Sequence, residues 1–378
     1  MAERSAAPLN WPAVVMFAVT TGAAVILVPW YAFAYGFSPT AWWCGGLLMY
    51  LTGLSITAGY HRLWAHRAYE AHPAVEWVYL LFGAMALQNS VFCWTAQHRS
   101  HHRFIDDVDN DPYAIGRGFW FAHMGWMLRN YPSARDGDFS NINDLQHNPR
   151  LRFQHRHYLV LALGMNLGVP AVLGLACGDV WGVMLLAGLL RLVLNHHFTF
   201  FINSLAHSWG RRPYTAANTA RDNDLVALLT YGEGYHNFHH QFQWDYRNGV
   251  RWWQFDPTKW LIATLAWLRL AHGLKRVPEF RIQRAMLARQ FERLQARLAL
   301  TQKDGRWVRF AGLVDKEREL FAATLAEWRQ LQAERFGAVR RRLAGQWSGS
   351  ELRSQLSGLE RALHAQRRRV RLLRLQLA

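Results

Sequence analysis

The sequence holds three short histidine clusters, HRLWAH at 61–66, HRSHH at 98–102 and HNFHH at 236–240, and one more histidine four residues after Asn203. These nine histidines are His61, His66, His98, His101, His102, His207, His236, His239 and His240. Neutral imidazole is a good ligand for iron, copper or zinc. Nine imidazoles exceed what one four-coordinate zinc ion can use, so two metal ions are the natural count. The pattern therefore predicts a metal site.

The spacing indicates how helices would present these ligands. In H-x-x-H-H on an α-helix, the first histidine has neighbours at i+3 and i+4, so all three lean over one face. Asn203 and His207 share a face for the same reason. His61 and His66 would be about 140° apart on an ideal helix, so we expect them to straddle a helix end.

The other histidines carry a weaker signal. Six of them are expected to be hydrogen-bonded or interfacial residues: His72, His123, His147, His155, His157 and His272. His196 and His197 form a pair inside an apolar stretch, and two interpretations stay open for them. They are either further ligands or a buried polar pair that satisfies its neighbours.

Four segments resemble the membrane-bound acyl-CoA desaturases of the stearoyl-CoA type. They are HRLWAHRAYEA at 61–71, QNSVFCWTAQHRSHH at 88–102, NSLAH at 203–207 and GEGYHNFHH at 232–240. The resemblance covers residues 12–275, and its motifs appear in the order typical of that family. It implies a non-haem di-iron centre held by the nine histidines, with Asn203 reaching one iron through water.

The same resemblance implies an activity and its partners. The expected reaction is oxygen-dependent desaturation of a fatty acyl chain. Acyl-CoA is the expected substrate, and delta-9 is one candidate position for the double bond. Dioxygen would be the co-substrate, and an external donor of the cytochrome b5, ferredoxin or flavoprotein type would supply electrons.

The resemblance also implies a kinked tunnel for the acyl chain. Its positions here are Gln88, Trp94, Thr199 and Phe200 near the irons, Met49 and Gly53 toward the closed end, and Asn89 and Arg129 at the CoA head group. Two sites depart from the animal enzymes: Ala96 and Gln97 replace an Arg-Asp pair, and Asn130 replaces a lysine. Because these charges are missing, an acyl chain on a carrier protein or a phospholipid stays open as an alternative substrate.

Redox metals suit such a substrate. Removing two hydrogens from an unactivated alkyl chain requires a strong oxidant, which metals and dioxygen supply and acids, bases or nucleophiles do not. Zinc has no redox chemistry, so iron is expected. Ligating histidines also need an anchor for their second nitrogen. The candidates are Asp106, Asp107, Asp109, Asp111 and Glu233, with a solvated loop as the alternative for the run 106–111.

Apolar runs of about 20 residues predict four transmembrane helices, at 11–35, 40–60, 158–177 and 180–206. The first is expected to stay uncleaved, since its apolar run exceeds that of a signal peptide. A fifth run at 74–94 lies between two histidine clusters, so it must stay on one side of the membrane, as an interfacial helix, if the ligands are to meet. Arg191, inside the fourth run, needs a polar partner.

Charge predicts the orientation. The loops on the side of the histidine clusters carry ten arginines between residues 62 and 156, whereas the opposite hairpins carry no lysine or arginine. By the positive-inside rule, the metal site and both termini are expected in the cytoplasm.

The chain divides by charge near Gly273. Residues 275–378 hold 24 Lys and Arg against 10 Asp and Glu, which is +14 of the total +17. We therefore expect a membrane desaturase domain at 1–274 and a basic helical extension at 275–378. Leu352, Leu356, Leu359, Leu363 and Val370 follow a short heptad pattern that would suit a coiled coil and self-association. Anionic lipid, an acidic redox partner, or no specific partner are the alternatives.

The sequence thus predicts an all-α integral membrane protein with a cytoplasmic helical di-metal domain. Two other functions stay open. A related di-iron membrane hydroxylase or oxygenase would share the histidine clusters, and product analysis separates the two. A non-enzymatic metal-binding or transport protein would place histidines along a path through the bilayer, whereas these gather on one side. The three cysteines lack C-x-x-C spacing, so a disulfide or iron–sulfur framework is unsupported. Nucleic acid is not an expected partner.

Overall fold

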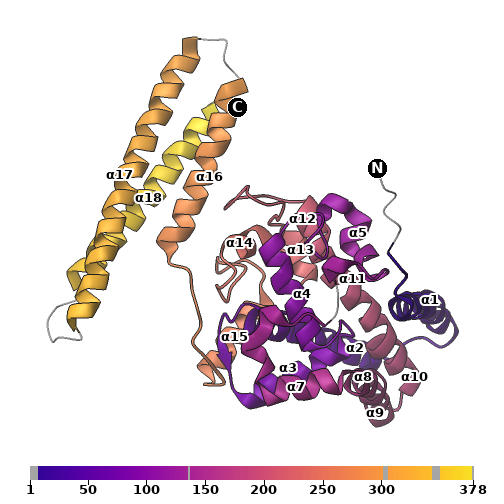
Figure 1. Cartoon of the computed structure of the whole chain (residues 1–378). Helices are drawn as coiled ribbons and strands as arrows, with labels where there is room; N and C mark the ends of the chain where they lie inside the picture. The colour runs from indigo at the N-terminus through magenta and orange to yellow at the C-terminus, as the bar shows by residue number, and fades with distance from the viewer. Residues whose placement is uncertain (1–6, 135–136, 301–304, 343–349, 377–378) are drawn as a thin grey trace. The chain divides into compact units, whose positions relative to one another are not determined.

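The computed structural model describes residues 7–134, 137–300, 305–342 and 350–376. These are predominantly helical and form two compact units (Figure 1). One comprises the chain up to Arg211 together with Asn218–Arg276, and the other comprises Arg212–Ala217 and the chain from Val277. The first unit contains all nine clustered histidines.

Three helical segments of the first unit are long and apolar enough to cross a membrane. They are α1 (Trp11–Ala34), the run Tyr158–Cys177 formed by α8 (Tyr158–Leu163), η6 (Gly164–Gly168) and α9 (Val169–Cys177), and the run Val180–Ser208. The last is formed by α10 (Val180–Val183), η7 (Met184–Leu190), α11 (Arg191–Asn203) and α12 (Leu205–Ser208). Large apolar side chains such as Ile26 and Phe33 stand exposed on α1, as expected for a lipid-facing helix.

The expected span 40–60 lies within a helix but is not among those three segments. It falls in α2 (Pro39–Leu54), which continues directly into the π-helix η1 (Ser55–Ala65). The side chain of Ser38 accepts a hydrogen bond from the Ala41 N–H and caps its start.

Arg191 has the polar partners that its apolar surroundings require. Its guanidinium donates to the Met85 carbonyl at 2.9 Å, to Asn166 Oδ1 at 2.6 Å and to the Ala187 carbonyl at 3.0 Å. The arginine therefore ties η7 and α11 to neighbouring helices instead of facing lipid.

The apolar run 74–94 is two helices and not the single interfacial helix expected from the sequence. It contains α3 (Pro73–Met85) and the start of α4 (Val91–Phe104). Between them Leu87 and Asn89 adopt positive φ, and the Ser90 hydroxyl caps α4 by accepting from the Cys93 N–H. With 13 residues, α3 is too short to cross a bilayer. The turn gives α4, which carries the second histidine cluster, a new direction.

Short elements complete the first unit. They are η2 (Ile115–Arg117), α5 (Phe119–His123), η3 (Gly125–Met127), η4 (Pro132–Ala134), η5 (Ser140–Ile142), α6 (Asn143–Gln146), α7 (Pro149–Arg156), α13 (Asp224–Leu229), α14 (His236–Gln241) and α15 (Pro257–Trp267). Strands β1 (Glu70–Ala71) and β2 (Ala271–His272) pair antiparallel, with Ala71 opposite Ala271. The buried core joins side chains of η1, α3, α4, α7 and α15. This packing holds η1 and α4, two of the ligand-bearing helices, against each other.

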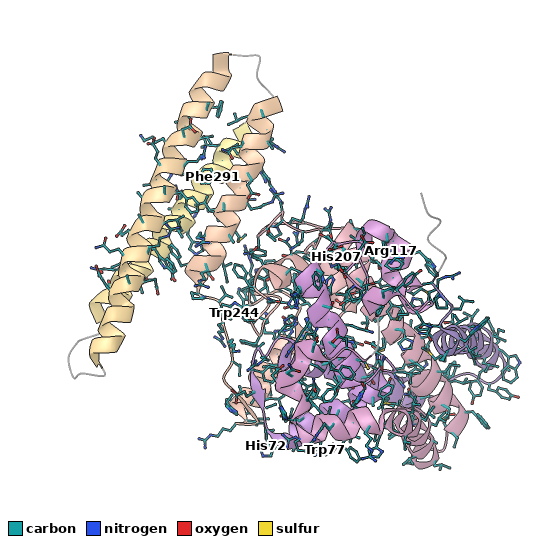
Figure 2. All side chains as sticks on the ribbon, in the orientation of Figure 1. His72, Trp77, Arg117, His207, Trp244 and Phe291 are labelled. Atoms are coloured by element: carbon teal, nitrogen blue, oxygen red, sulfur yellow. The ribbon has the colours of Figure 1, made fainter. Side chains whose placement is uncertain are left out.

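The second unit contains α16 (Glu279–Leu300), α17 (Gly305–Arg342) and α18 (Ser350–Gln376). Phe280 stacks on Trp328 at 4.4 Å between ring centroids, and Phe291 lies between the helices (Figure 2). Leu359, Leu363 and Val370 of the heptad pattern are buried in this core, and Leu356 packs against it. The expected seam thus packs within the chain, and self-association stays a prediction. The sequence also predicts a helix break at GQWSG, residues 345–349, which lie outside the described residues.

Candidate metal centre

A π-helix positions the first pair of histidines. His61 lies in η1 and His66 caps its end, and the His66 N–H donates to the His61 carbonyl at 3.0 Å, which is the i→i+5 bond of a π turn. The wide turn brings the centroids of the two imidazole rings to 4.7 Å from each other. The expectation that this pair marks a helix end is confirmed, but the π geometry is what brings the rings together.

The other ligand candidates come from four further helices. The H-x-x-H-H clusters lie on α4 and on α14, as their spacing predicts. Asn203 ends α11 and His207 lies on α12, with Ser204 between the two helices.

All nine histidines gather in two groups whose ring nitrogens lie within 4.8 Å of one another. The first group is His61, His66, His98, His102 and His239, and the second is His101, His207, His236 and His240. In the first group the Nε2 atoms of His66 and His98 are 2.8 Å apart, and those of His102 and His239 are 3.0 Å apart. In the second, His236 Nε2 lies 3.1 Å from His207 Nε2 and 3.0 Å from His240 Nε2.

These donor sets fit metal ions. Burial, followed by the neighbouring histidines, holds the pKa values of His98, His102 and His239 well below the usual range, so their rings are neutral and present lone pairs. Several nitrogen lone pairs converging on one point repel each other unless a cation lies between them. With metal–nitrogen bonds of about 2.1 Å, two ligands at right angles would lie about 3.0 Å apart, which is the spacing found.

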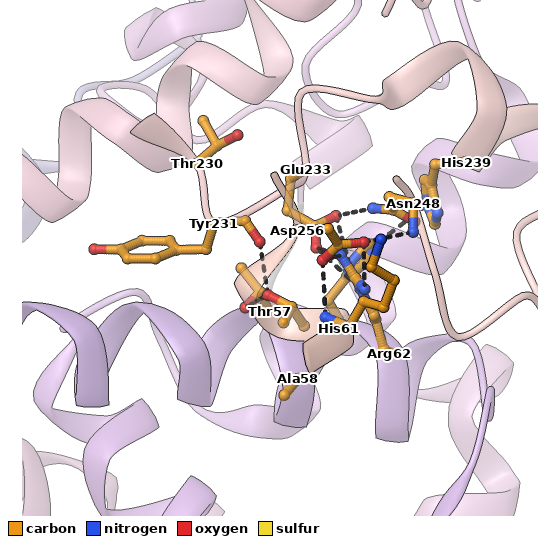
Figure 3. A network of polar contacts seen from close by, with 12 residues as sticks. Thr57, Ala58, His61, Arg62, Thr230, Tyr231, Glu233, His239, Asn248 and Asp256 are labelled. Carbon is orange, nitrogen blue, oxygen red and sulfur yellow. Dashed lines mark hydrogen bonds and ion pairs between the residues drawn. The ribbon is translucent and has the colours of Figure 1, made fainter. Parts of the chain in front are cut away.

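A buried ionic network anchors the first group (Figure 3). Glu233 Oε2 lies 2.9 Å from His61 Nδ1 and accepts from Asn248 Nδ2 at 2.6 Å. Arg62, which is 1% exposed, donates to Glu233 Oε1 at 2.8 Å and lies 3.0 Å from Asp256 Oδ1. Glu233 thereby fixes the ring of His61 with Nε2 turned toward the other ligands.

The charged groups of this network shift each other's pKa values in favour of the ionised forms. Burial would raise the pKa of Glu233, but His61 and Arg62 outweigh it and hold this pKa below the usual value. Burial would likewise lower the pKa of Arg62, but Asp256 and Glu233 raise it above its usual value. Glu233 is therefore ionised, and its Oε2 can accept a hydrogen bond from the Nδ1–H of His61, 2.9 Å away.

The acidic run 106–111 divides between the two roles that the sequence left open. Asp111 Oδ1 lies 2.8 Å from His101 Nδ1, and Thr219 joins Asp106 to His207 by contacts of 2.5 and 2.8 Å. Asp107 instead accepts bonds from the backbone of its own loop. The Asp109 N–H donates to Asp107 Oδ1 at 2.9 Å.

A cavity of about 940 Å³ borders both histidine groups. His61 and His98 of the first group and His101 and His236 of the second contribute to its wall, as does Asn203. Seven of the eight substrate-binding candidates also line it: Gly53, Gln88, Asn89, Trp94, Arg129, Thr199 and Phe200. Met49 is not part of this wall, and its carbonyl oxygen lies 3.1 Å from the Tyr231 hydroxyl oxygen.

Polar side chains of the wall already have partners. Gln88 Nε2 donates to Thr199 Oγ1 at 2.9 Å, and Trp94 stacks on His98 with ring centroids 5.0 Å apart. Arg129 donates to the Ala7 carbonyl at 2.6 Å and pairs with Leu9 in a short bridge. The volume of the cavity is that of a ligand pocket. Its wall includes four of the histidine ligand candidates.

Residues 38–274 match the family described as fatty acid desaturase. The chain belongs to this family. It is 45% identical over 237 residues to the probable acyl-CoA desaturase of Schizosaccharomyces pombe, covering 62% of this chain and 49% of that protein. It is 41% identical over 248 residues to acyl-CoA desaturase 1 of Saccharomyces cerevisiae, covering 65% and 48%. To stearoyl-CoA desaturase 5 of Homo sapiens it is 36% identical over 230 residues, covering 60% and 69%. The chain spans about half the length of the first two relatives.

Three further histidines of this desaturase-family chain have other contacts. His196 Nε2 lies 2.9 Å from the Ala86 carbonyl, and His197 Nδ1 lies 3.0 Å from His123 Nε2, which itself approaches Ser204 through Nδ1. Neither His196 nor His197 lies in a metal-binding group. The structure thus favours the interpretation of a buried polar pair that satisfies its neighbours.

Sequence reasoning did not single out Arg62, Asp256, Asn248 or Thr219. A signal existed for Arg62, because a charged residue beside His61 in a buried helix needs a carboxylate partner. Thr219 lies in a long loop and gives no comparable signal.

The stability of the metal-free protein is expected to decrease as the pH is lowered below about 6.5, the usual histidine pKa. Burial lowers the pKa values of His66, His98 and His240. The unfolded chain therefore binds more protons than the folded one in this range, and each such histidine costs up to about 1.4 kcal/mol per pH unit. The measurement is the melting temperature of chelator-treated protein between pH 8 and pH 5. A melting temperature that stays flat or rises on acidification would contradict the buried neutral arrangement.

Proposed function

We propose that the chain desaturates a fatty acyl chain at a non-haem di-iron centre, with dioxygen as co-substrate and electrons from an external donor. The observation that carries this is the gathering of nine imidazoles into two groups at the wall of a 940 Å³ cavity. The names of the relatives, acyl-CoA desaturase and stearoyl-CoA desaturase, support acyl-CoA as the substrate. Delta-9 is the candidate position for the double bond.

Each histidine group would hold one iron, with Asn203 reaching one of them through water. Bound iron and dioxygen would supply an oxidant able to break an unactivated C–H bond. Glu233 and Asp111 would keep the ligands His61 and His101 oriented through their Nδ1 atoms. Iron binds neutral imidazole, and burial keeps these rings neutral even before a metal binds. The chain therefore presents its nitrogen donors in the form that iron requires.

The wall of the cavity would hold the acyl chain beside the metals. Trp94 and Phe200 offer aromatic surface to an alkyl chain. Gln88 and Thr199 bond to each other, so an apolar substrate leaves neither side chain without a partner. Asn89 and Arg129 are the proposed contacts for the head group.

Coenzyme A is the proposed carrier of the acyl chain. Gln97 and Asn130, which stand where animal enzymes carry charge, both line the cavity. Purified protein would be supplied with electrons and offered stearoyl-CoA, the matching acyl-carrier protein and a phospholipid. A monounsaturated product from the CoA ester supports the proposal, and an alcohol would make the chain a hydroxylase instead.

We propose a cytoplasmic metal site and four membrane spans. Thr40–Tyr60, within α2 and η1, would cross the membrane in addition to the three apolar segments described above. The arginines of the loops near the histidine clusters support a cytoplasmic location for those loops and both termini.

We propose further that residues 275–378 form a separate basic domain that contacts anionic lipid or an acidic donor. A chain ending at Arg276 is expected to keep its metal, because the nine histidines all precede Gln241. Metal content per chain is the measurement, and activity with the natural reductase against a small chemical reductant is the companion assay. Only the activity with the protein donor should fall, and the loss should be smaller at high salt, where the charges of the basic domain are already screened in the full-length chain. Loss of metal on truncation would show that the basic domain completes the fold of the metal site.

A further inference from the structure

We propose that Tyr231 closes the end of the acyl cavity and sets the longest chain that the protein accepts. This inference rests on the proposed function. It names a residue that the sequence did not single out, two positions before the ionic anchor Glu233.

Tyr231 bridges two helices with its hydroxyl group. The phenol donates to Asn195 Oδ1 on α11 at 2.6 Å, and its oxygen lies 3.1 Å from the Met49 carbonyl on α2. The side chain is 7% exposed, and its backbone has a φ of +57°, which few residues without glycine's freedom adopt. A buried side chain held at both helices in this way is a fixed part of the wall.

The lining of the cavity stops at the level of this ring. On α2 and η1 the wall is formed by Gly53, Ile56, Thr57 and His61, so it runs along two turns of helix, roughly 10–12 Å. Tyr231 belongs to the wall, whereas Met49, one turn before Gly53 and bonded to the phenol, does not. Asn195, which also holds the phenol, is likewise outside it. The Tyr231 ring therefore separates the cavity from Met49 on α2 and Asn195 on α11.

Gly53 provides the space that the ring occupies. A Cβ atom at Gly53 would lie 2.2 Å from Cε2 and from Cζ of Tyr231, far inside van der Waals contact. The same atom at Gly46, two turns earlier on α2, would meet no heavy atom within 4 Å. The small residue on α2 and the large one on the loop are thus complementary.

The backbone of Tyr231 is fixed relative to the metal ligands. Thr258 donates to the Tyr231 carbonyl at 2.8 Å and lies 2.7 Å from Thr57. Figure 3 shows the ring extending away from the ionic network of Glu233 and Asp256. The distance between the closing ring and the first histidine group is therefore set by the fold, which is what a length limit requires.

The test compares products from saturated acyl chains of even length, C14 to C22, supplied as a mixture. Tyr231→Ala opens the end of the cavity and is expected to raise the ratio of products longer than the wild-type optimum roughly tenfold, since two further buried methylenes contribute about 0.8 kcal/mol each. Tyr231→Phe keeps the ring and should leave this ratio within about twofold. An active Tyr231→Ala protein with the wild-type ratio would overturn the proposal.

Gly53→Ala tests the contact from the other side. Its Cβ collides with the ring, so total product should fall at least tenfold, whereas Gly46→Ala should behave like the wild type. The double variant Gly53→Ala/Tyr231→Ala should recover activity with the longer product range. Equal behaviour of Gly53→Ala and Gly46→Ala, or no recovery in the double variant, would count against the proposed contact.

A binding measurement separates this inference from the proposed function. The shift in melting temperature of metal-loaded protein by saturated acyl chains of each length needs no turnover. Tyr231→Ala should move the most stabilising length upward by two carbons or more, even if that variant or the wild type forms no double bond. Wild-type protein that binds chains but makes no unsaturated product would refute the proposed reaction alone, and an unmoved length optimum would refute the role of Tyr231.

Discussion

His101→Ala and His239→Ala are each expected to lose bound iron and at least about 100-fold in desaturation, more than the loss typical of a supporting residue. His239 Nε2 lies within 3.1 Å of His61 Nε2 and 3.0 Å of His102 Nε2 in the first group. His101 Nε2 lies 3.3 Å from His240 Nε2 in the second. Because the variants affect different groups, each should lower the metal content from about two ions per chain, as elemental analysis would measure.

His272→Ala is the matched control. His272 is largely exposed and lies 3.0 Å from Glu70, outside both histidine groups. Its replacement should leave metal content and activity unchanged. Full activity in His101→Ala or His239→Ala, or zinc in an active wild-type protein, would contradict the assignment of the metal centre.

Arg62→Leu is expected to have the largest effect on stability. Arg62 compensates two buried carboxylates, Glu233 and Asp256, and its removal leaves both without their cation. Breaking a buried pair from one side costs about 3–5 kcal/mol, which corresponds to a fall of roughly 10 °C in the apparent melting temperature. The affinity of the first group for iron should also fall, because Glu233 loses the partner that keeps it ionised beside His61.

An exposed ion pair provides the control for Arg62. Arg211 lies 2.5 Å from Asp224, and both side chains are more than half exposed. Arg211→Leu should change stability by less than about 1 kcal/mol, since solvent already screens such a pair. Similar melting temperatures for the two variants would show that the network of Arg62 does not support the site.

The candidate site was predictable from the sequence because its chemistry needs residues that are rare elsewhere. The nine histidines have ligand spacing on short helices, and the fold brings all of them into two groups. The anchors were less predictable. Glu233 and Asp111 were among the candidates, but Thr219 reaches His207 from a loop whose path no periodicity reveals.

The fold departs from the expectations where local geometry overrides composition. An ideal α-helix would separate His61 and His66, but the π turn, which hydrophobic periodicity does not indicate, brings them together. The run 74–94 is continuous in hydropathy, yet the capping residue Ser90 starts a new helix within it. The complementarity of Gly53 and Tyr231 joins residues far apart in the sequence, so only their spatial contact reveals it.

The most direct test of the account is the fatty-acid profile of a desaturase-deficient host that expresses this chain. Monounsaturated fatty acids should appear with the wild-type chain and be absent with His239→Ala at equal expression. Mass spectrometry of the total fatty acids provides the measurement, and the position of the double bond follows from the same sample. Hydroxylated fatty acids in place of unsaturated ones, or an unchanged profile from a chain that holds two irons, would contradict acyl desaturation.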